Sequence, residues 1–179
     1  MLVLASKSPR RRELLKIIVP EFVSTTSEID ESVFQVEDPY QLPLVLSEAK
    51  AKDVARKFPH DTILASDTIV IFQGEVLGKP KDKEDAERML HLLSGNAHDV
   101  VTAFTILKQG KMIQDFDITK VKFHVLSEKT IKEYIATGSP MDKAGAYGIQ
   151  DENFHLVESI EGSYYNVMGL PVEKLKKYF

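Results

Sequence analysis

The chain has 179 residues, of which 43% are hydrophobic and 28% are charged, and its formal net charge is −4. This composition is typical of one globular domain or two small lobes, and it excludes the overall basic charge of a nucleic-acid-binding protein. Because cysteine is absent, disulfides, thiolate catalysis and cysteine-ligated metals are excluded as well. No apolar run reaches the ~20 residues of a membrane span, and the N-terminal run is too short for a signal peptide, so we expect a cytoplasmic protein.

The first predicted unit, "LVLASKSPRRRELL", is a strand, a loop and a helix with arginines in its first turn. Residues 2–4 form the apolar strand, Ser8 is a good N-cap, and Pro9 suits the first helical position. The arginines at 10–12 then lie at the positive end of the helix dipole, where each costs roughly 0.3–1 kcal/mol. An anion bound at this turn would offset that cost.

The arginine turn has two interpretations. Solvated arginines that cover apolar surface would be a structural feature only. A phosphate site is favoured, because the small residues Ala5, Ser6 and Ser8 let an anion approach the helix-start amides and the guanidinium groups. This turn alone does not identify an enzyme.

Residues 20–26 predict a second strand, and the acidic stretch "SEIDESVFQVED" predicts a loop. The carboxylates considered for chemistry in this loop are Glu28, Asp30 and Glu31. A solvated acidic run is the favoured interpretation, and Mg²⁺ ligation is the alternative. An Asp-Pro pair then predicts a helix from residue 39 to about residue 58.

A strand-rich segment follows in "DTILASDTIVIFQGEVLGKP", where a Gln-Gly turn leads to a short return strand. Polar residues interrupt the apolar run at Ser66, Asp67 and Thr68. A carboxylate among so many apolar residues is costly unless it is paired, metal-bound or at a strand edge. Asp67 is therefore either bonded to backbone at a bulge, or a metal ligand or general base on the floor of a cleft.

Lys79 lies between a glycine and a proline at the end of this segment, in a rigid loop. It is either a solvated loop lysine or a cation that reaches a phosphate. The clearest helix follows in "DKEDAERMLHLLSGN", with an apolar face at positions 86, 89, 90 and 93. A long hairpin over 99–126 is expected to turn at Gln109-Gly110.

The remaining chain predicts a helix that Ser127 caps and Gly138 ends, then the stretch "SPMDKAGAYGIQD". Its glycines and alanines permit close approach of a ligand to the backbone, and the Gln150 amide could read a base edge. The alternative is a tightly packed turn. The tail is expected to alternate short strands with glycine turns and to end in a helix from Pro171.

Strands and helices mix along the whole chain, which predicts an α/β or α+β domain with a mixed sheet. Neither a Walker A motif nor G-x-G-x-x-G after a strand is present, and G-x-S-x-G is also missing. P-loop, Rossmann and nucleophile-elbow sites are therefore excluded. The five histidines have no metal-ligand spacing, so we expect them to be surface or packing residues.

These motifs, taken together, resemble the Maf family of nucleoside triphosphate pyrophosphatases, also called septum formation inhibitors. The opening "LASKSPRRRELL", the central "ASDTIV" and the lysine loop "GEVLGKP" match the family in order, and so do "LLSGNAHDVVTA", "DKAGAYGIQ" and "IEGSYYNVMGLP". The resemblance extends from about residue 2 to residue 175 and so covers one domain, 1–179. Where most members have a glycine after "GIQ", this chain has Asp151, which could change the loop shape beside Gln150.

The resemblance implies hydrolysis of a nucleoside triphosphate to a monophosphate and pyrophosphate, with Mg²⁺ or Mn²⁺. It implies an elongated mixed α/β sheet flanked by helices, with two lobes around a deep cleft, similar to the inosine triphosphatase family. A homodimer is implied too. The subfamily that acts on dTTP, UTP and modified pyrimidine analogues carries arginine, threonine and glutamine at marked positions, which here are Arg11, Thr68 and Gln150.

The resemblance and the residues together give each side chain a role. Glu31 and Asp67 would bind the metal, and Asp67 would orient or deprotonate the attacking water. Thr68 and Gln150 would lie near the pyrimidine. The groups expected to hold and neutralise the triphosphate are Ser6, Arg10, Arg11, Lys50 and Lys79.

Two other functions remain open at this point. A nucleotide-binding regulator of cell division would bind the triphosphate and a partner protein with little turnover. A phosphomonoesterase would release orthophosphate in place of pyrophosphate.

Overall fold

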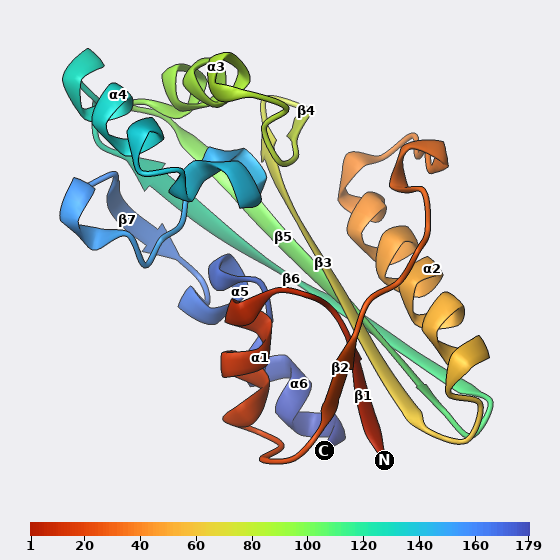
Figure 1. Cartoon of the computed structure of the whole chain (residues 1–179). Coiled ribbons are helices and arrows are strands. Elements are labelled where there is room, and N and C mark those ends of the chain that lie inside the picture. Colours follow the sequence, from red (N-terminus) through yellow and green to blue (C-terminus); the bar gives the residue numbers. More distant parts are fainter.

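The computed structural model describes all residues from Met1 to Phe179 and contains one seven-stranded mixed sheet with strand order β2-β1-β3-β5-β6-β7, to which β4 adds by pairing with β3 (Figure 1). The strands are β1 (Leu2–Ala5), β2 (Val23–Thr25), β3 (Thr62–Phe72), β4 (Glu75–Leu77), β5 (Ala97–Lys108), β6 (Lys111–Phe123) and β7 (Val157–Glu161). The helices are α1 (Pro9–Lys16), α2 (Leu42–Lys57), α3 (Lys83–Leu93), α4 (Glu128–Ala136), α5 (Tyr164–Met168) and α6 (Val172–Leu175). The mixed α/β prediction is confirmed.

The long strands β3, β5 and β6 connect two lobes (Figure 1). One lobe holds α3 and α4 with β4 and β7, around a core cluster of 17 buried residues. The other holds β1, β2 and the helices α1, α2, α5 and α6, and its buried residues form separate clusters on the two faces of the sheet. The expected elongated, two-lobed sheet is present.

The two faces of β3 receive different helices, because successive side chains of a strand point to opposite faces. Leu64 packs with residues of α1 and α6, whereas Ile63 and Ala65 pack with α2. The same alternation directs Thr68 toward the α1 side and Asp67 toward the α2 side. Although they are adjacent in sequence, Thr68 and Asp67 therefore project from opposite faces of the sheet.

One edge of β3 is left without a pairing strand over a few residues. Strand β1 pairs with β3 only as far as Leu64, and β4 begins to pair at Val70. Between them, residues 65–69 of β3 are paired only with β5. The polar residues at 66–68 lie at this open edge.

Several local predictions are confirmed. Ser8 caps α1 by accepting from the Arg11 amide, and Pro9 is its first residue. The expected apolar face of α3 is buried. The β5–β6 hairpin turns at Gln109 and Gly110, which both have positive φ (50° and 76°) as a tight hairpin turn requires.

The prediction for the tail was wrong for its strands, whereas the final helix expected from Pro171 is present as α6, with Pro171 as its N-cap. After α4, the chain forms short 3₁₀ segments, a single strand β7 and the helices α5 and α6, in place of alternating short strands. Ser163 caps α5, and Gly169 ends it with φ 118°. The acidic stretch expected to be a loop also contains a 3₁₀ turn over Glu31–Val33, and the helix expected from residue 39 begins with a 3₁₀ turn over Pro39–Gln41 before α2.

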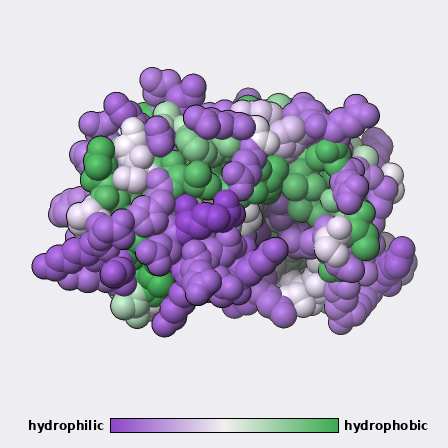
Figure 2. All heavy atoms as spheres, turned by 90° about the horizontal axis from the view of Figure 1, so that it is seen from above, coloured by the Kyte–Doolittle hydropathy of each residue, from purple (hydrophilic) through white to green (hydrophobic).

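On the face seen from above, hydrophilic side chains dominate, and hydrophobic residues form a broken band among them (Figure 2). None of the helices combines the length and the apolar character that a membrane span requires.

Candidate active site

A cleft with a volume of about 660 Å³ lies at the open edge of β3. It brings together segments that are far apart in the sequence: the β1–α1 turn, the acidic stretch, α2, β3, the lysine loop and the glycine-rich stretch before β7. All the predicted site residues line it, namely Ser6, Arg10, Arg11, Glu31, Lys50, Asp67, Thr68, Lys79 and Gln150.

Asp67 is buried, with 7% of its surface exposed, and its partner is Lys50 from α2. The Lys50 Nζ lies 2.6 Å from Asp67 Oδ1 and 2.7 Å from Glu31 Oε1, so one ammonium joins two carboxylates from different elements. The β3–β5 register runs without a shift through this position. The alternative of a backbone-bonded carboxylate at a bulge is therefore wrong, because an ion pair with Lys50 stabilises the buried charge.

The carboxylates of the acidic stretch make different contacts. Asp30 Oδ1 accepts from the Ser32 amide and hydroxyl, which caps the 3₁₀ turn and lowers the pKa of Asp30. Glu28 points to α2, where it pairs with Lys57 at 3.2 Å. Glu31, next to the capping residue, is the carboxylate that this turn presents to the cleft. Glu31 is solvated as expected, with 54% of its side chain exposed, but it also pairs with Lys50 and lines the cleft.

Arg11 is the most firmly held of the arginines at the helix start. Its Nε donates to the Gly169 carbonyl at 2.7 Å and its Nη2 donates to Thr68 Oγ1 at 3.0 Å. Burial lowers the pKa of Arg11, and the carboxylate of Asp67 opposes this effect. A guanidinium has five N–H donors and stays charged in proteins, so the remaining donors are available to an anion in the cleft.

The neighbouring arginines differ from Arg11. Arg10 Nη1 lies 3.3 Å from Asp142 Oδ2, at the rim of the cleft. Arg12 is exposed and forms no ion pair. Ser6 is buried, accepts from the Ser8 amide at 3.1 Å, and can donate its own hydroxyl proton into the cleft. The turn therefore presents donors from Ser6, Arg10 and Arg11 to the same space.

Lys79 and Gln150 line the same cleft. The Gly145 amide donates to the Gly78 carbonyl at 3.1 Å, which ties the lysine loop to the glycine-rich stretch. Gly145 has φ +69°, and a Cβ there would lie 2.8 Å from Val70 Cγ2. For this glycine the packed-turn interpretation holds, because the space that it leaves is taken by Val70 and not by a ligand.

The whole sequence matches the family described as Maf-like protein, over residues 1–179. The chain belongs to the Maf family. A relative from Pyrococcus furiosus, named dTTP/UTP pyrophosphatase, is 49% identical to this Maf chain over 171 residues, which is 96% of the chain and 90% of the relative. Relatives with the same name from Geobacillus and Clostridium botulinum are 46% and 47% identical, and each comparison covers 97% of the chain and 93% of the relative.

A solved structure supports the fold assignment. The HAM1 protein from Coxiella burnetii has a TM-score of 0.50 to the Maf chain at 12% identity, and the comparison covers 98% of this chain and 96% of that one. At this identity the likeness shows the fold alone. This likeness agrees with the expected inosine triphosphatase-like (Maf/Ham1) fold.

Asp151, where most Maf proteins are expected to have glycine, has a defined structural role. Its Oδ2 accepts from the Tyr134 hydroxyl at 2.6 Å and from the Ser139 hydroxyl at 2.6 Å. The Tyr134 oxygen in turn accepts from the Gly148 amide at 2.9 Å. The carboxylate therefore anchors the stretch that carries Gln150 to α4.

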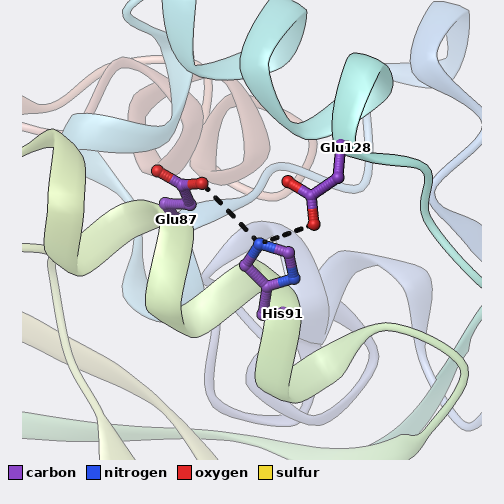
Figure 3. A group of neighbouring side chains, drawn as sticks. All are labelled: Glu87, His91 and Glu128. Atoms are coloured by element: carbon purple, nitrogen blue, oxygen red, sulfur yellow. Dashed lines mark ion pairs between the residues drawn. The ribbon is translucent and has the colours of Figure 1, made fainter.

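Sequence reasoning missed one cluster, which lies outside the cleft of the Maf chain. His91 on α3 has its Nε2 3.7 Å from Glu87 and 3.2 Å from Glu128, at the start of α4 (Figure 3). The spacing of Glu87 and His91, four residues apart on a helix, was the available signal. All three side chains are at least two-fifths exposed, and a protonated His91 forms ion pairs with Glu87 and with Glu128. In that state the pair with Glu128 links α3 to the start of α4 at the surface.

Proposed function

We propose that this protein hydrolyses dTTP and UTP, and modified pyrimidine analogues, to the nucleoside monophosphate and pyrophosphate. The observation that carries the proposal is the convergence of arginines 10 and 11, Lys50 and Lys79 on one cleft. There Lys50 also pairs with two carboxylates, the buried Asp67 and the exposed Glu31. Relatives that align over nearly the whole chain are named dTTP/UTP pyrophosphatase.

The cations account for binding of the triphosphate. A triphosphate carries several negative charges, and guanidinium and ammonium groups in a partly enclosed cleft neutralise them through charge-assisted hydrogen bonds. Arg11 is held by Gly169 and Thr68, so it needs little reordering when the nucleotide binds. Positioning and electrostatic stabilisation are the dominant contributions expected for phosphoryl chemistry.

Asp67 would act on the attacking water. In the proposed step, Asp67 orients a water molecule in line with the α-phosphorus and accepts its proton. The new P–O bond forms as the bond from the α-phosphorus to its bridging oxygen breaks, and pyrophosphate leaves with that oxygen. No covalent enzyme intermediate is required, because water is the nucleophile.

The pair Asp67 and Glu31 suits a divalent cation of the Mg²⁺ or Mn²⁺ type. Both residues offer hard oxygen ligands, and they already converge on one cation, the Lys50 ammonium, at 2.6 and 2.7 Å. We propose that these carboxylates hold the metal, which when bound would neutralise negative charge on the phosphate oxygens. Lys50 would then turn from the carboxylates to the phosphates.

We assign Thr68 and Gln150 to the pyrimidine side of the cleft, where Thr68 is half-buried. Uncharged hydrogen-bonding groups fit a uracil or thymine edge, which offers two acceptors and one donor. We further propose that the protein acts as a homodimer, and light scattering coupled to size exclusion tests this state.

Product analysis tests the proposed function. Purified protein is incubated with Mg²⁺ or Mn²⁺ and a panel of triphosphates, and the products are separated. We expect monophosphate and pyrophosphate, formed fastest from dTTP or UTP. Orthophosphate as the first product would indicate a phosphomonoesterase, and bound nucleotide without turnover would indicate a regulator, so either result contradicts the proposal.

A further inference from the structure

A chain of hydrogen bonds runs from the cleft into the protein behind Thr68. Arg11 Nη2 lies 3.0 Å from Thr68 Oγ1, which lies 2.9 Å from Thr102 Oγ1. Thr102 Oγ1 in turn lies 2.9 Å from the Asn166 carbonyl oxygen. Thr102 was not singled out by the sequence, and it does not line the cleft.

The direction of every bond in this chain follows from its two ends. The Asn166 carbonyl can only accept, so Thr102 gives it its single hydroxyl proton. Thr102 must then accept the proton of Thr68, because otherwise two oxygens 2.9 Å apart would have no hydrogen between them. The Arg11 guanidinium can only donate, so it fills one acceptor position of Thr68.

The surrounding structure keeps Thr102 from rotating away. Thr102 is fully buried and stands directly opposite Thr68 in the β3–β5 register. Asn166 is fully buried as well, and its Nδ2 donates to the Val100 carbonyl at 3.1 Å and to Thr119 Oγ1 at 3.0 Å. A buried hydroxyl with satisfied partners is costly to reorient, because any other rotamer leaves polar atoms unpaired.

The consequence appears at the half-buried Thr68. Its one proton is committed to Thr102 and one lone pair to Arg11, so only an acceptor position remains for a ligand in the cleft. We take N3 of the base to face Thr68, where uracil and thymine carry a hydrogen and can donate to this oxygen. Cytosine in the same position has an unprotonated N3, which would place two acceptors against each other.

We propose that Thr102 is a specificity-determining positioning residue: it fixes the hydroxyl of Thr68 as an acceptor, so that the cleft takes uracil or thymine and rejects cytosine. This inference rests on the proposed function, since it needs Thr68 beside the base. It adds a residue that touches neither base nor phosphate.

The test compares Thr102→Val with the matched control Thr102→Ser, using UTP and CTP. Valine has the shape of threonine and cannot accept the Thr68 proton, which becomes free to donate to cytosine N3. The Asn166 carbonyl keeps the Gly169 amide as a donor at 3.1 Å, so the buried oxygen is not orphaned. We expect the ratio of kcat/KM for UTP to that for CTP to fall about tenfold or more in Thr102→Val, with CTP turnover rising, and to persist in Thr102→Ser.

An equal loss on both nucleotides in Thr102→Val, with an unchanged ratio, would overturn the inference and leave the proposed function in place. Absence of pyrophosphate release by the unaltered protein would overturn the proposed function and this inference with it. Thermal unfolding of each variant checks the fold. If Thr102→Val does not fold, Thr102→Cys provides a weak hydrogen-bonding side chain, and a ratio equal to that of the unaltered protein would then overturn the inference.

Discussion

The Arg11 Nε donates a 2.7 Å hydrogen bond to the carbonyl of Gly169, 158 positions later in the chain. Gly169 has φ +118°, and a Cβ there would lie 3.5 Å from Arg11 Nε and 3.6 Å from Thr68 Oγ1. The end of α5 therefore fixes the direction of a guanidinium that belongs to the first helix. The two ends of the sequence are joined where the substrate is proposed to bind.

Arg11→Lys tests this orientation. Lysine keeps the charge but replaces the planar fork, whose Nε and Nη2 donate to Gly169 and Thr68, with a single nitrogen on a flexible chain. We therefore expect kcat/KM for UTP to fall about 100-fold, through a higher KM and a lower kcat. Steady-state kinetics provide the measurement. Arg12→Lys is the matched control, because Arg12 is exposed and unpaired, and its kinetics should stay unchanged. Normal kinetics in Arg11→Lys would make Arg11 a structural helix residue.

Asp67→Asn tests the chemical step. Asparagine keeps the shape and a hydrogen-bonding oxygen but cannot take a proton from water, so kcat should fall by about 10²–10⁴. Nucleotide binding, measured by calorimetry, should change little. A folded Asp67→Asn protein with full turnover would remove this carboxylate from the mechanism.

Lys50→Met tests the exchange of cations at the carboxylate pair. Removing the ammonium leaves Asp67 and Glu31 without their partner, so a divalent cation should bind more tightly. Turnover should nevertheless fall, because a charge that would neutralise phosphate is lost. Titration with Mn²⁺, followed by its magnetic resonance signal, gives the affinity.

The control for that titration is Lys52→Met on the same helix, where the lysine pairs with Glu48 at the surface. Its Mn²⁺ affinity should equal that of the unaltered protein. Weaker Mn²⁺ binding in Lys50→Met would contradict the expectation that Lys50 competes with the metal.

His98 makes stability depend on pH. It is buried against Tyr147, whose hydroxyl lies 2.7 Å from Nε2, and burial lowers the pKa of His98 from 6.5 to about 4, although Asp99 opposes the shift. The unfolded chain binds the proton first as pH falls. The contribution to the free energy of unfolding is therefore complete above pH 6.5 and is lost between pH 6.5 and 4. The shift of this pKa from 6.5 to about 4 corresponds to about 3 kcal/mol in the free energy of unfolding.

Urea unfolding at pH 7 and at pH 4.5 measures this effect. His98→Gln should be less stable at pH 7 but should lose less stability on acidification than the unaltered protein. His60→Gln, an exposed histidine, should keep the full pH dependence. If the free energy of unfolding fell by the same amount between pH 7 and pH 4.5 in the His98→Gln and unaltered proteins, another group would cause the pH dependence.

Asp151→Gly tests the anchor beside Gln150. Losing the carboxylate leaves the buried Tyr134 hydroxyl without its 2.6 Å acceptor, so we expect a loss of about 2–3 kcal/mol in the free energy of unfolding. The backbone of Asp151 has φ −80°, so glycine relieves no strain there. Asp151→Asn keeps an acceptor and should lose less. Equal stability of the glycine variant and the unaltered protein would contradict this role.

The sequence predicted the elements whose signals are local. Ser8 and Pro9 begin α1, and Gln109-Gly110 turns the β5–β6 hairpin, because each feature depends on residues a few positions apart. The strands of the tail were mispredicted because its glycines were taken as strand turns, whereas in the structure Gly169 ends a short helix. The final helix from Pro171 was predicted. For Gly145 the sequence left two interpretations open, and only the contact with Val70, which no local pattern contains, decided for the packed turn.

By itself, the sequence determined which residue types are available to the site, since the motifs name the arginines, the carboxylates, the lysines and Gln150 that line the cleft. Only the tertiary structure decided how they are paired. The apolar residues around Asp67 in the sequence indicate that its charge is buried and needs a cation. That this cation is Lys50 was decided only by the packing of α2 on β3. The direction of the Thr68 hydroxyl likewise depends on Thr102 and Asn166, because hydrogen bonds form between neighbours in space and not in sequence.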